Sequence, residues 1–183
     1  MIIPTYNWQF SLQVEDADFT KIAKSAGLSS EVACLLYQRG IRDESSLKKF
    51  LEPSLEDLHN PYLLHDMDKA VERIRQAIEQ GELILVYGDY DADGMTSASI
   101  VKESLEQLGA ECLVYLPNRF TDGYGPNASV YKYFIEQQGV SLIVTVDNGV
   151  AGHEAIDLAQ SMGVDVIVTD HHSMPEVLPD AYA

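Results

Sequence analysis

Positive charge is scarce in this sequence. The 183 residues contain 12 lysines and arginines against 29 aspartates and glutamates, which gives a formal net charge of −17 at pH 7. Because phosphate binding relies on Lys and Arg, a chain this acidic is not expected to form a nucleic-acid clamp by itself. Two explanations fit the excess acid: carboxylates that hold metal ions, and a basic surface on another part of the protein.

Cysteine and long apolar runs are also rare. Cys34 and Cys112 stand far apart, so we expect neither a disulfide framework nor a CxxC metal site, and we interpret both as reduced thiols. No apolar run approaches the ~20 residues that cross a bilayer. The first residues, MIIPTYNWQF, lack a basic region and a cleavage site, so we expect no signal peptide. These absences predict a cytoplasmic protein without a membrane partner.

The order of apolar patterns divides the chain near residue 66. Residues 1–65 carry short segments with apolar residues at helical spacing, which predicts a small helical segment. From 66 to 183, helical patterns alternate with short, almost continuously apolar strands. This alternation predicts an α/β domain with a mainly parallel sheet and helices on both faces. The predicted strands cover residues 82–88, 111–117, 141–149 and 164–170.

Polar side chains gather directly after each predicted strand. Parallel strands end at one edge of a sheet, and ligands of open α/β sheets bind at that edge. The strand ends therefore bring carboxylates, imidazoles and an arginine together. They are Asp89, Asp91 and Asp93 after the first strand, Asn118 and Arg119 after the second, Asp147 and Asn148 after the third, and Asp170, His171 and His172 after the fourth.

The spacing of the three aspartates after the first strand favours a metal site. In an extended chain, the side chains of Asp89, Asp91 and Asp93 point the same way. Two ionised carboxylates ~4 Å apart repel by ~4 kcal/mol at an effective dielectric constant of ~20. Bound divalent cations explain such a cluster best. Carboxylates combined with one or two imidazoles favour Mn²⁺, with Mg²⁺ as a substitute.

Each of these motifs has a simpler explanation when it is taken alone. The DxDxDG spacing resembles an EF-hand loop, but the twelfth position is Ile100 rather than a glutamate. Paired histidines often cap helices, and Asp147 before Asn-Gly is compatible with a plain turn. The meeting of all four strand ends favours the metal site over these separate explanations.

Other residues at the same edge are less specific. Arg119 offers a guanidinium fork to a phosphate; pairing with Asp122 is the simpler alternative, and we favour the phosphate role. The GYG at 123–125, which contains Tyr124, is either a flexible turn or part of a substrate site. We expect Asp170 to orient an imidazole rather than to bind metal. Four other tyrosines are interpreted as packing residues: Tyr87, Tyr90, Tyr131 and Tyr133.

Four motifs in order, GDYDADGMTS, PNRFTDGYG, VTVDNG and VIVTDHH, resemble those of the DHH phosphoesterase superfamily. The second motif is similar to that of its RecJ branch, the single-strand-specific exonucleases. The resemblance covers residues 66–183, and the helical segment before them is similar as well. It implies a DHH phosphoesterase N-terminal domain that hydrolyses phosphodiester bonds by a two-metal mechanism. It also implies degradation of single-stranded DNA from the 5′ end, in DNA repair and recombination.

The resemblance further implies a role for each matching residue. Two divalent cations, Mn²⁺ or Mg²⁺, would be held at the strand ends, and Asp147 would lie between them. The implied metal ligands are Asp91, Asp93, Asp147 and His171; the implied catalytic residues are Asp89, His172 and Arg119; the implied substrate contacts are Asn118, Arg119, Tyr124 and His172; and Asp170 would support an imidazole.

The pattern of this family continues beyond the last motif, with a further metal-binding aspartate and C-terminal domains that grip DNA. We therefore expect the present chain alone to bind metal weakly and to show little nuclease activity. Single-stranded DNA is the expected partner, mainly through those domains. A single-strand-binding protein and a helicase are the candidate protein partners.

Three alternative functions are to be distinguished from the exonuclease. A DHH phosphodiesterase acting on short oligonucleotides or cyclic dinucleotides would keep the fold and the metals. A non-catalytic RecJ-like scaffold would have lost metal ligands, and every ligand expected in this region is present. A nucleotide-binding Rossmann protein would need glycines and amides, rather than carboxylates, after its first strand.

Overall fold

The computed structural model describes residues 16–183; residues 1–15, where the predicted helical segment starts, lie outside the described part. The chain divides into two compact units, residues 1–60 and residues 61–183. The boundary that the sequence suggests near residue 66 stays a prediction. Within residues 16–183, no helix combines the length and the apolar character needed to cross a membrane.

The first unit contains three short helices, α1 (Ala17–Ser25), α2 (Ser30–Gln38) and α3 (Glu44–Leu51). Each begins after a polar residue whose side chain accepts backbone N–H groups of the first turn: Asp16, Ser29 and Asp43. One apolar side of each helix faces a small common core. The core consists of Phe19, Ala23, Ala33, Leu36 and Leu47. A 3-10 turn, η1 (Leu55–Asp57), follows.

The second unit is built on a four-stranded sheet in which every pairing is parallel. The strands are β1 (Leu83–Tyr87), β2 (Glu111–Tyr115), β3 (Val140–Val146) and β4 (Asp165–Thr169), arranged in the order β2-β1-β3-β4. Three of the strands lie within the predicted segments, and β3 begins one residue before its segment, at Val140. The parallel sheet of the sequence-based prediction is therefore confirmed.

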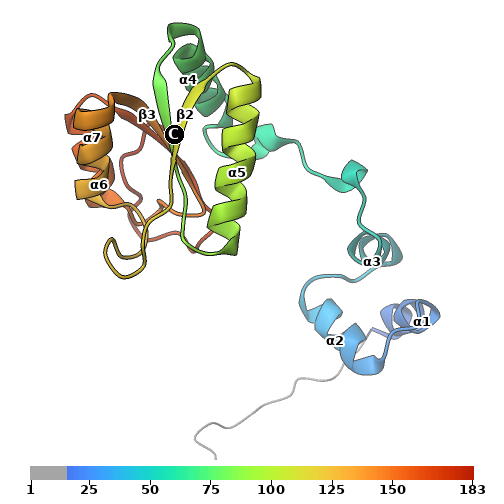
Figure 1. Cartoon of the computed structure of the whole chain (residues 1–183). Helices are drawn as coiled ribbons and strands as arrows, with labels where there is room; N and C mark the ends of the chain where they lie inside the picture. The colour runs from blue at the N-terminus through green and yellow to red at the C-terminus, as the bar shows by residue number, and fades with distance from the viewer. Residues whose placement is uncertain (1–15) are drawn as a thin grey trace, which may run out of the picture. The chain divides into compact units, whose positions relative to one another are not determined.

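Helices cover both faces of this sheet (Figure 1). After the 3-10 turn η2 (Pro61–Leu63), they are α4 (Met67–Gln80), α5 (Ala92–Gln107), α6 (Ala128–Tyr133), which continues as the π-helical turn η3 (Phe134–Gln138), and α7 (His153–Ser161). Helices α4 and α5 pack on one face, and α6 and α7 pack on the other. Alternate residues of β1 consequently enter different cores, Ile84 and Val86 on the first face and Leu85 and Tyr87 on the second.

A buried arginine ties α4 to the starting edge of the sheet. Arg73 donates to Asp165 at 2.6 Å and to Glu82 at 2.7 Å, and it also reaches the carbonyl of Ser141. Asp165 begins β4 and Glu82 precedes β1. The starting edge of the sheet is therefore held by charge, whereas the opposite edge is left for the polar strand ends.

Candidate metal centre at the strand ends

The strand order places a topological switch point between β1 and β3. The chain passes from β1 to β2 on one side, and the later strands β3 and β4 lie on the other side. Loops that leave the two central strands separate here, and open α/β folds bind ligands in the resulting crevice. The residues that follow β1 and β3 are Asp89, Asp91 and Asp147, which the sequence placed at this edge.

The loop after β1 is shorter than the sequence suggested. Helix α5 begins at Ala92, and Asp91 caps it by accepting the N–H groups of Asp93 and Gly94 at 3.0 and 3.1 Å. The expectation of an extended chain from Asp89 to Asp93 is therefore wrong. Asp93 lies in the first helical turn, because the free N–H groups of a helix start attract the preceding carboxylate. The Gly94 N–H is the largest influence that lowers the pKa of Asp91.

A glycine makes this tight turn possible. A Cβ atom at Gly94 would lie 2.4 Å from the backbone nitrogen of Asp89, a distance that no side chain can occupy. The start of α5 therefore rests directly on the end of β1. Asp89 is buried under it, with 2% of its surface exposed, and its carboxylate accepts the N–H of Tyr90 at 2.7 Å.

Asp147 occupies the centre of the arrangement. Its backbone is in the left-handed region with φ of 62°, and its N–H donates to the carbonyl of Thr169 in β4. Its Oδ1 lies 2.8 Å from Nε2 of His171, whereas its Oδ2 is buried without a hydrogen-bond partner. Burial raises the pKa of Asp147, the nearby Asp91 carboxylate adds to this effect, and His171 opposes it. A buried carboxylate oxygen without a partner is a place where a cation fits.

The turn that carries Asp147 is held by two neighbours to which the sequence gave no role. Asn148 is buried and donates to the carbonyls of Val146 and Tyr87 at 2.9 and 3.3 Å, so it joins the ends of β3 and β1. Thr145 donates to the carbonyl of Asn148 at 2.7 Å. The motif VTVDNG contains both residues, but their contacts depend on neighbouring strands and no local pattern reveals them.

Asp170 orients the second histidine. Its Oδ2 accepts the N–H of Val150 at 3.0 Å, and its Oδ1 accepts the backbone N–H of His172 and lies 2.7 Å from that ring's Nδ1. Burial opposes ionisation of Asp170, but these hydrogen bonds together outweigh it and lower its pKa. The same contact is the main cause that raises the pKa of His172. This geometry supports the expectation that Asp170 positions an imidazole.

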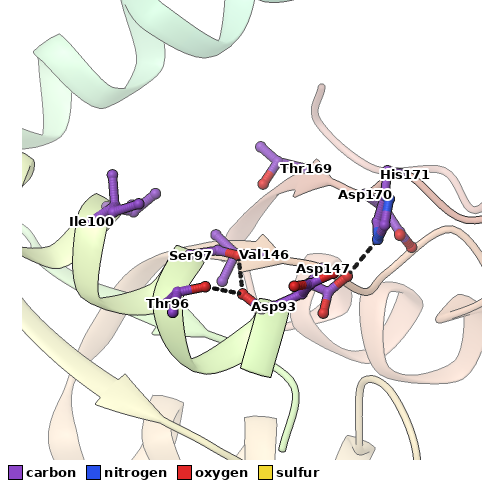
Figure 2. A pocket seen from close by; sticks show the side chains of 10 residues that line it. Asp93, Thr96, Ser97, Ile100, Val146, Asp147, Thr169, Asp170 and His171 are labelled. Carbon is purple, nitrogen blue, oxygen red and sulfur yellow. Dashed lines mark hydrogen bonds and ion pairs between the residues drawn. The ribbon is translucent and has the colours of Figure 1, made fainter. Parts of the chain in front are cut away.

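Among residues 16–183, two overlapping groups have ligand atoms that all lie within 4.8 Å of one another. One contains Asp89, Asp91 and Asp147, and the other contains Asp147, His171 and His172. Asp147 alone belongs to both. Asp93 belongs to neither group, although it lines the same pocket of about 490 Å³ together with Asp147 and His171 (Figure 2).

The loop after β2 holds three of the four predicted substrate residues, Asn118, Arg119 and Tyr124. Asp122 organises it by accepting the N–H of Asn118 and the hydroxyl of Tyr115, both at 2.7 Å. The predicted alternative of an Arg119–Asp122 ion pair does not form. The Asn118 side-chain oxygen accepts the N–H of Phe120 within the loop itself. The Tyr124 hydroxyl lies 3.2 Å from Nε2 of His172, so this loop reaches the histidine pair.

The amino-acid sequence of residues 83–183 matches the DHH family, N-terminal domain. Because this match covers more than half of the chain, the chain belongs to the DHH family.

Several relatives of similar sequence are single-stranded-DNA-specific exonucleases named RecJ. The chain is 40% identical over 184 residues to RecJ of Bacillus subtilis, covering 100% of this chain and 23% of that protein. It is 38% identical over 169 residues to RecJ of Escherichia coli, covering 89% of this chain and 28% of that one. This chain thus spans about a quarter of the length of the curated relatives it matches.

Solved structures agree with this assignment. RecJ from Thermus thermophilus in complex with Mn²⁺ matches with a TM-score of 0.64 and 29% identity, over 91% of this chain and 22% of that one. An exonuclease RecJ bound to manganese matches with a TM-score of 0.61 and 34% identity, over 65% of this chain and 30% of that one. This chain therefore shares its fold with the matched parts of two manganese-bound RecJ proteins.

Proposed function

We propose that this chain forms the metal-holding catalytic part of a metal-dependent single-stranded-DNA exonuclease. The observation that carries the proposal is the position of Asp147, which belongs to both ligand groups and has a buried oxygen without a partner. Because the two ligand groups overlap at Asp147, they favour two cations that share its carboxylate. RecJ relatives with 38–40% identity and the two manganese-bound RecJ structures support the same conclusion.

The residues present fit two divalent cations. Asp89 and Asp91 would hold one cation and His171 would hold the other, with Asp147 between them; Asp93 faces the same pocket and completes the predicted ligand set. Carboxylates with an imidazole suit Mn²⁺, and Mg²⁺ is the substitute. When bound, such a pair supplies a nucleophile from water at neutral pH and offsets the charge that develops on the phosphate.

The protein's own side chains bind and orient the strand. Asp170 holds Nδ1 of His172, and the Tyr124 hydroxyl lies 3.2 Å from its Nε2. A phosphate oxygen that replaces the Tyr124 hydroxyl at Nε2 would accept a hydrogen bond from this ring. Arg119 supplies a second cationic donor from the loop after β2, and Asp89 accepts the Tyr90 N–H and keeps the first loop closed.

The substrate is the one that the relatives' names give, the direction and the cellular role are those that the resemblance of the motifs implies, and all three belong to this proposal. We infer hydrolysis of single-stranded DNA in the 5′ to 3′ direction, in DNA repair and recombination, by a cytoplasmic protein. The net charge of −17 means that the main grip on DNA lies outside these residues. A single-strand-binding protein and a helicase are the candidate protein partners for this role.

Single-turnover hydrolysis tests the proposal. The chain, in excess over a labelled single strand and with Mn²⁺ present, is expected to release mononucleotides slowly from the 5′ end. Asp147→Asn should abolish this release, while Asp157→Asn, which removes an exposed carboxylate of α7, should not. Hydrolysis of dinucleotides without any hydrolysis of long strands would contradict the exonuclease and favour a phosphodiesterase for short substrates.

A further inference from the structure

Arg119 has no carboxylate partner among residues 16–183, although the chain contains 29 acidic residues. Its nearest candidate in sequence, Asp122, has both oxygens in use. Oδ2 accepts the Asn118 N–H and the Tyr115 hydroxyl, and Oδ1 accepts the Thr121 hydroxyl at 2.9 Å. The guanidinium is therefore not neutralised by its own loop.

The guanidinium lies instead over an aromatic ring. The Cζ atom of Arg119 is 5.1 Å from the centroid of the Tyr90 ring, within the range of a cation–π interaction. A guanidinium held by its flat face keeps its N–H groups at the edge, where they can form a fork with an anion. An ion pair would occupy the same N–H groups and compete with a phosphate.

Tyr90 is well placed to fix this cation relative to the metal centre. It stands between Asp89 and Asp91, and its N–H donates to the buried Asp89 carboxylate. Its ring also contacts Tyr124, with 6.4 Å between centroids, and Tyr124 in turn contacts His172. Tyr90 and Tyr124 together thus connect the β1 loop, the β2 loop and the histidine loop.

We propose that Tyr90, which the sequence suggested was a packing residue, is a positioning residue: its ring holds the Arg119 guanidinium at the edge of the metal centre, ready to bind a phosphate of the DNA strand. The inference rests on the proposed function, since it names what aims the arginine of that same site. Tyr90 does not contact the reacting atoms and acts through Arg119.

Four variants of the 183-residue chain test the proposal: Tyr90→Leu, Tyr90→Phe, Arg119→Met and the double variant Tyr90→Leu/Arg119→Met. Fluorescence anisotropy of a labelled, 5′-phosphorylated tetrathymidylate in the presence of Mg²⁺ gives the dissociation constant of every variant, and the NMR signal of Arg119 Nε–H is followed in the chains that keep Arg119. Tyr90→Leu should raise the dissociation constant roughly threefold to tenfold, which corresponds to loss of one cation–π contact. Tyr90→Phe keeps the aromatic ring and should bind the oligonucleotide with the affinity of the unsubstituted chain.

The double variant separates positioning from general packing. If Tyr90 acts through Arg119, the double variant should bind no more weakly than Arg119→Met alone. Tyr133→Leu, which removes an exposed tyrosine of α6, is the matched control and should change nothing. Additive losses in the double variant, or equal losses in Tyr90→Leu and Tyr90→Phe, would overturn the proposal.

The outcome also distinguishes this inference from the proposed function. If Arg119→Met weakens binding and Tyr90→Leu leaves it unchanged, the phosphate role of Arg119 stands and the positioning role of Tyr90 falls. If the oligonucleotide never displaces the Arg119 signal of the unsubstituted chain, the phosphate role within the proposed function is itself contradicted, and with it the inference.

Discussion

Asp147 at the end of β3 and His171 after β4 face each other, with 2.8 Å between Oδ1 and Nε2. This contact uses only one oxygen of the carboxylate. The other oxygen is buried and points at no donor among the described residues. The pair therefore resembles two ligands held in place for a cation more than a completed ion pair, and the next prediction follows from this.

Asp147→Asn should separate folding from metal binding. Asparagine tolerates the left-handed backbone that Asp147 adopts, so the metal-free variant should remain folded. At an Mn²⁺ concentration about ten times the dissociation constant, the unsubstituted chain should gain ~1.4 kcal/mol of stability. The variant should gain almost none, as measured by urea denaturation with and without Mn²⁺. Asp157→Asn, the exposed control, should keep the gain; an equal gain in Asp147→Asn would contradict the shared-ligand role.

Gly94→Ala should destabilise the fold at the loop after β1. The added Cβ would lie 2.4 Å from the Asp89 backbone, so either the start of α5 or the end of β1 must move. Overpacking of this kind costs about 1–3 kcal/mol, and denaturant unfolding measures it. Ser99→Ala on the exposed side of the same helix should change stability by less than ~0.5 kcal/mol. Equal stability of the two variants would mean that Gly94 does not pack closely against the backbone of Asp89.

Removal of the Arg73 side chain should weaken the starting edge of the sheet. Arg73→Met leaves Glu82 and Asp165 without their common partner. Because Asp165 is partly exposed, we expect a loss of roughly 1–3 kcal/mol, below the cost of breaking a fully buried pair. Arg75→Met, which removes an arginine whose partners are all exposed, should cost less than ~1 kcal/mol. A similar loss in both variants would contradict the anchoring role of Arg73.

Asp122 should make the stability of the β2 loop depend on pH. The N–H of Asn118 is the main cause that lowers the pKa of Asp122 below its ordinary value of 3.8. A carboxylate with a lowered pKa stabilises the folded state above that ordinary value and loses this contribution as the pH falls through the folded pKa. The unsubstituted chain should therefore exceed Asp122→Asn in urea midpoint at pH 7, and the difference should vanish toward pH 2. A difference that grows on acidification would contradict this role.

Periodicity predicted the elements of the second unit because buried strands and amphipathic helices have local patterns. The sheet, its parallel pairing and the gathering of Asp91, Asp147 and His171 at one edge all followed from those patterns. The position of Asp93 did not, because capping by Asp91 starts α5 at Ala92, whereas the apolar pattern indicates a helix that starts at Ser97.

The contacts of Asn148 and Tyr90 also could not be predicted from the sequence. Asn148 donates to the carbonyl of Tyr87, which lies 61 residues away in the sequence and on another strand. The ring of Tyr90 contacts the guanidinium of Arg119, which belongs to another loop. Such contacts depend on how strands register and how loops cross, which no local pattern encodes. Pairing of Asp122 with Arg119 was the alternative to a phosphate role for Arg119, and it does not form because Asp122 accepts from the Asn118 N–H and the Tyr115 hydroxyl.

Anomalous scattering from Mn²⁺-soaked crystals of this chain tests the central claim most directly. Our account predicts two manganese peaks at the ends of β1, β3 and β4, both within bonding distance of the Asp147 carboxylate. A soak that fills no position at Asp147, or that places a single ion away from His171, would contradict it.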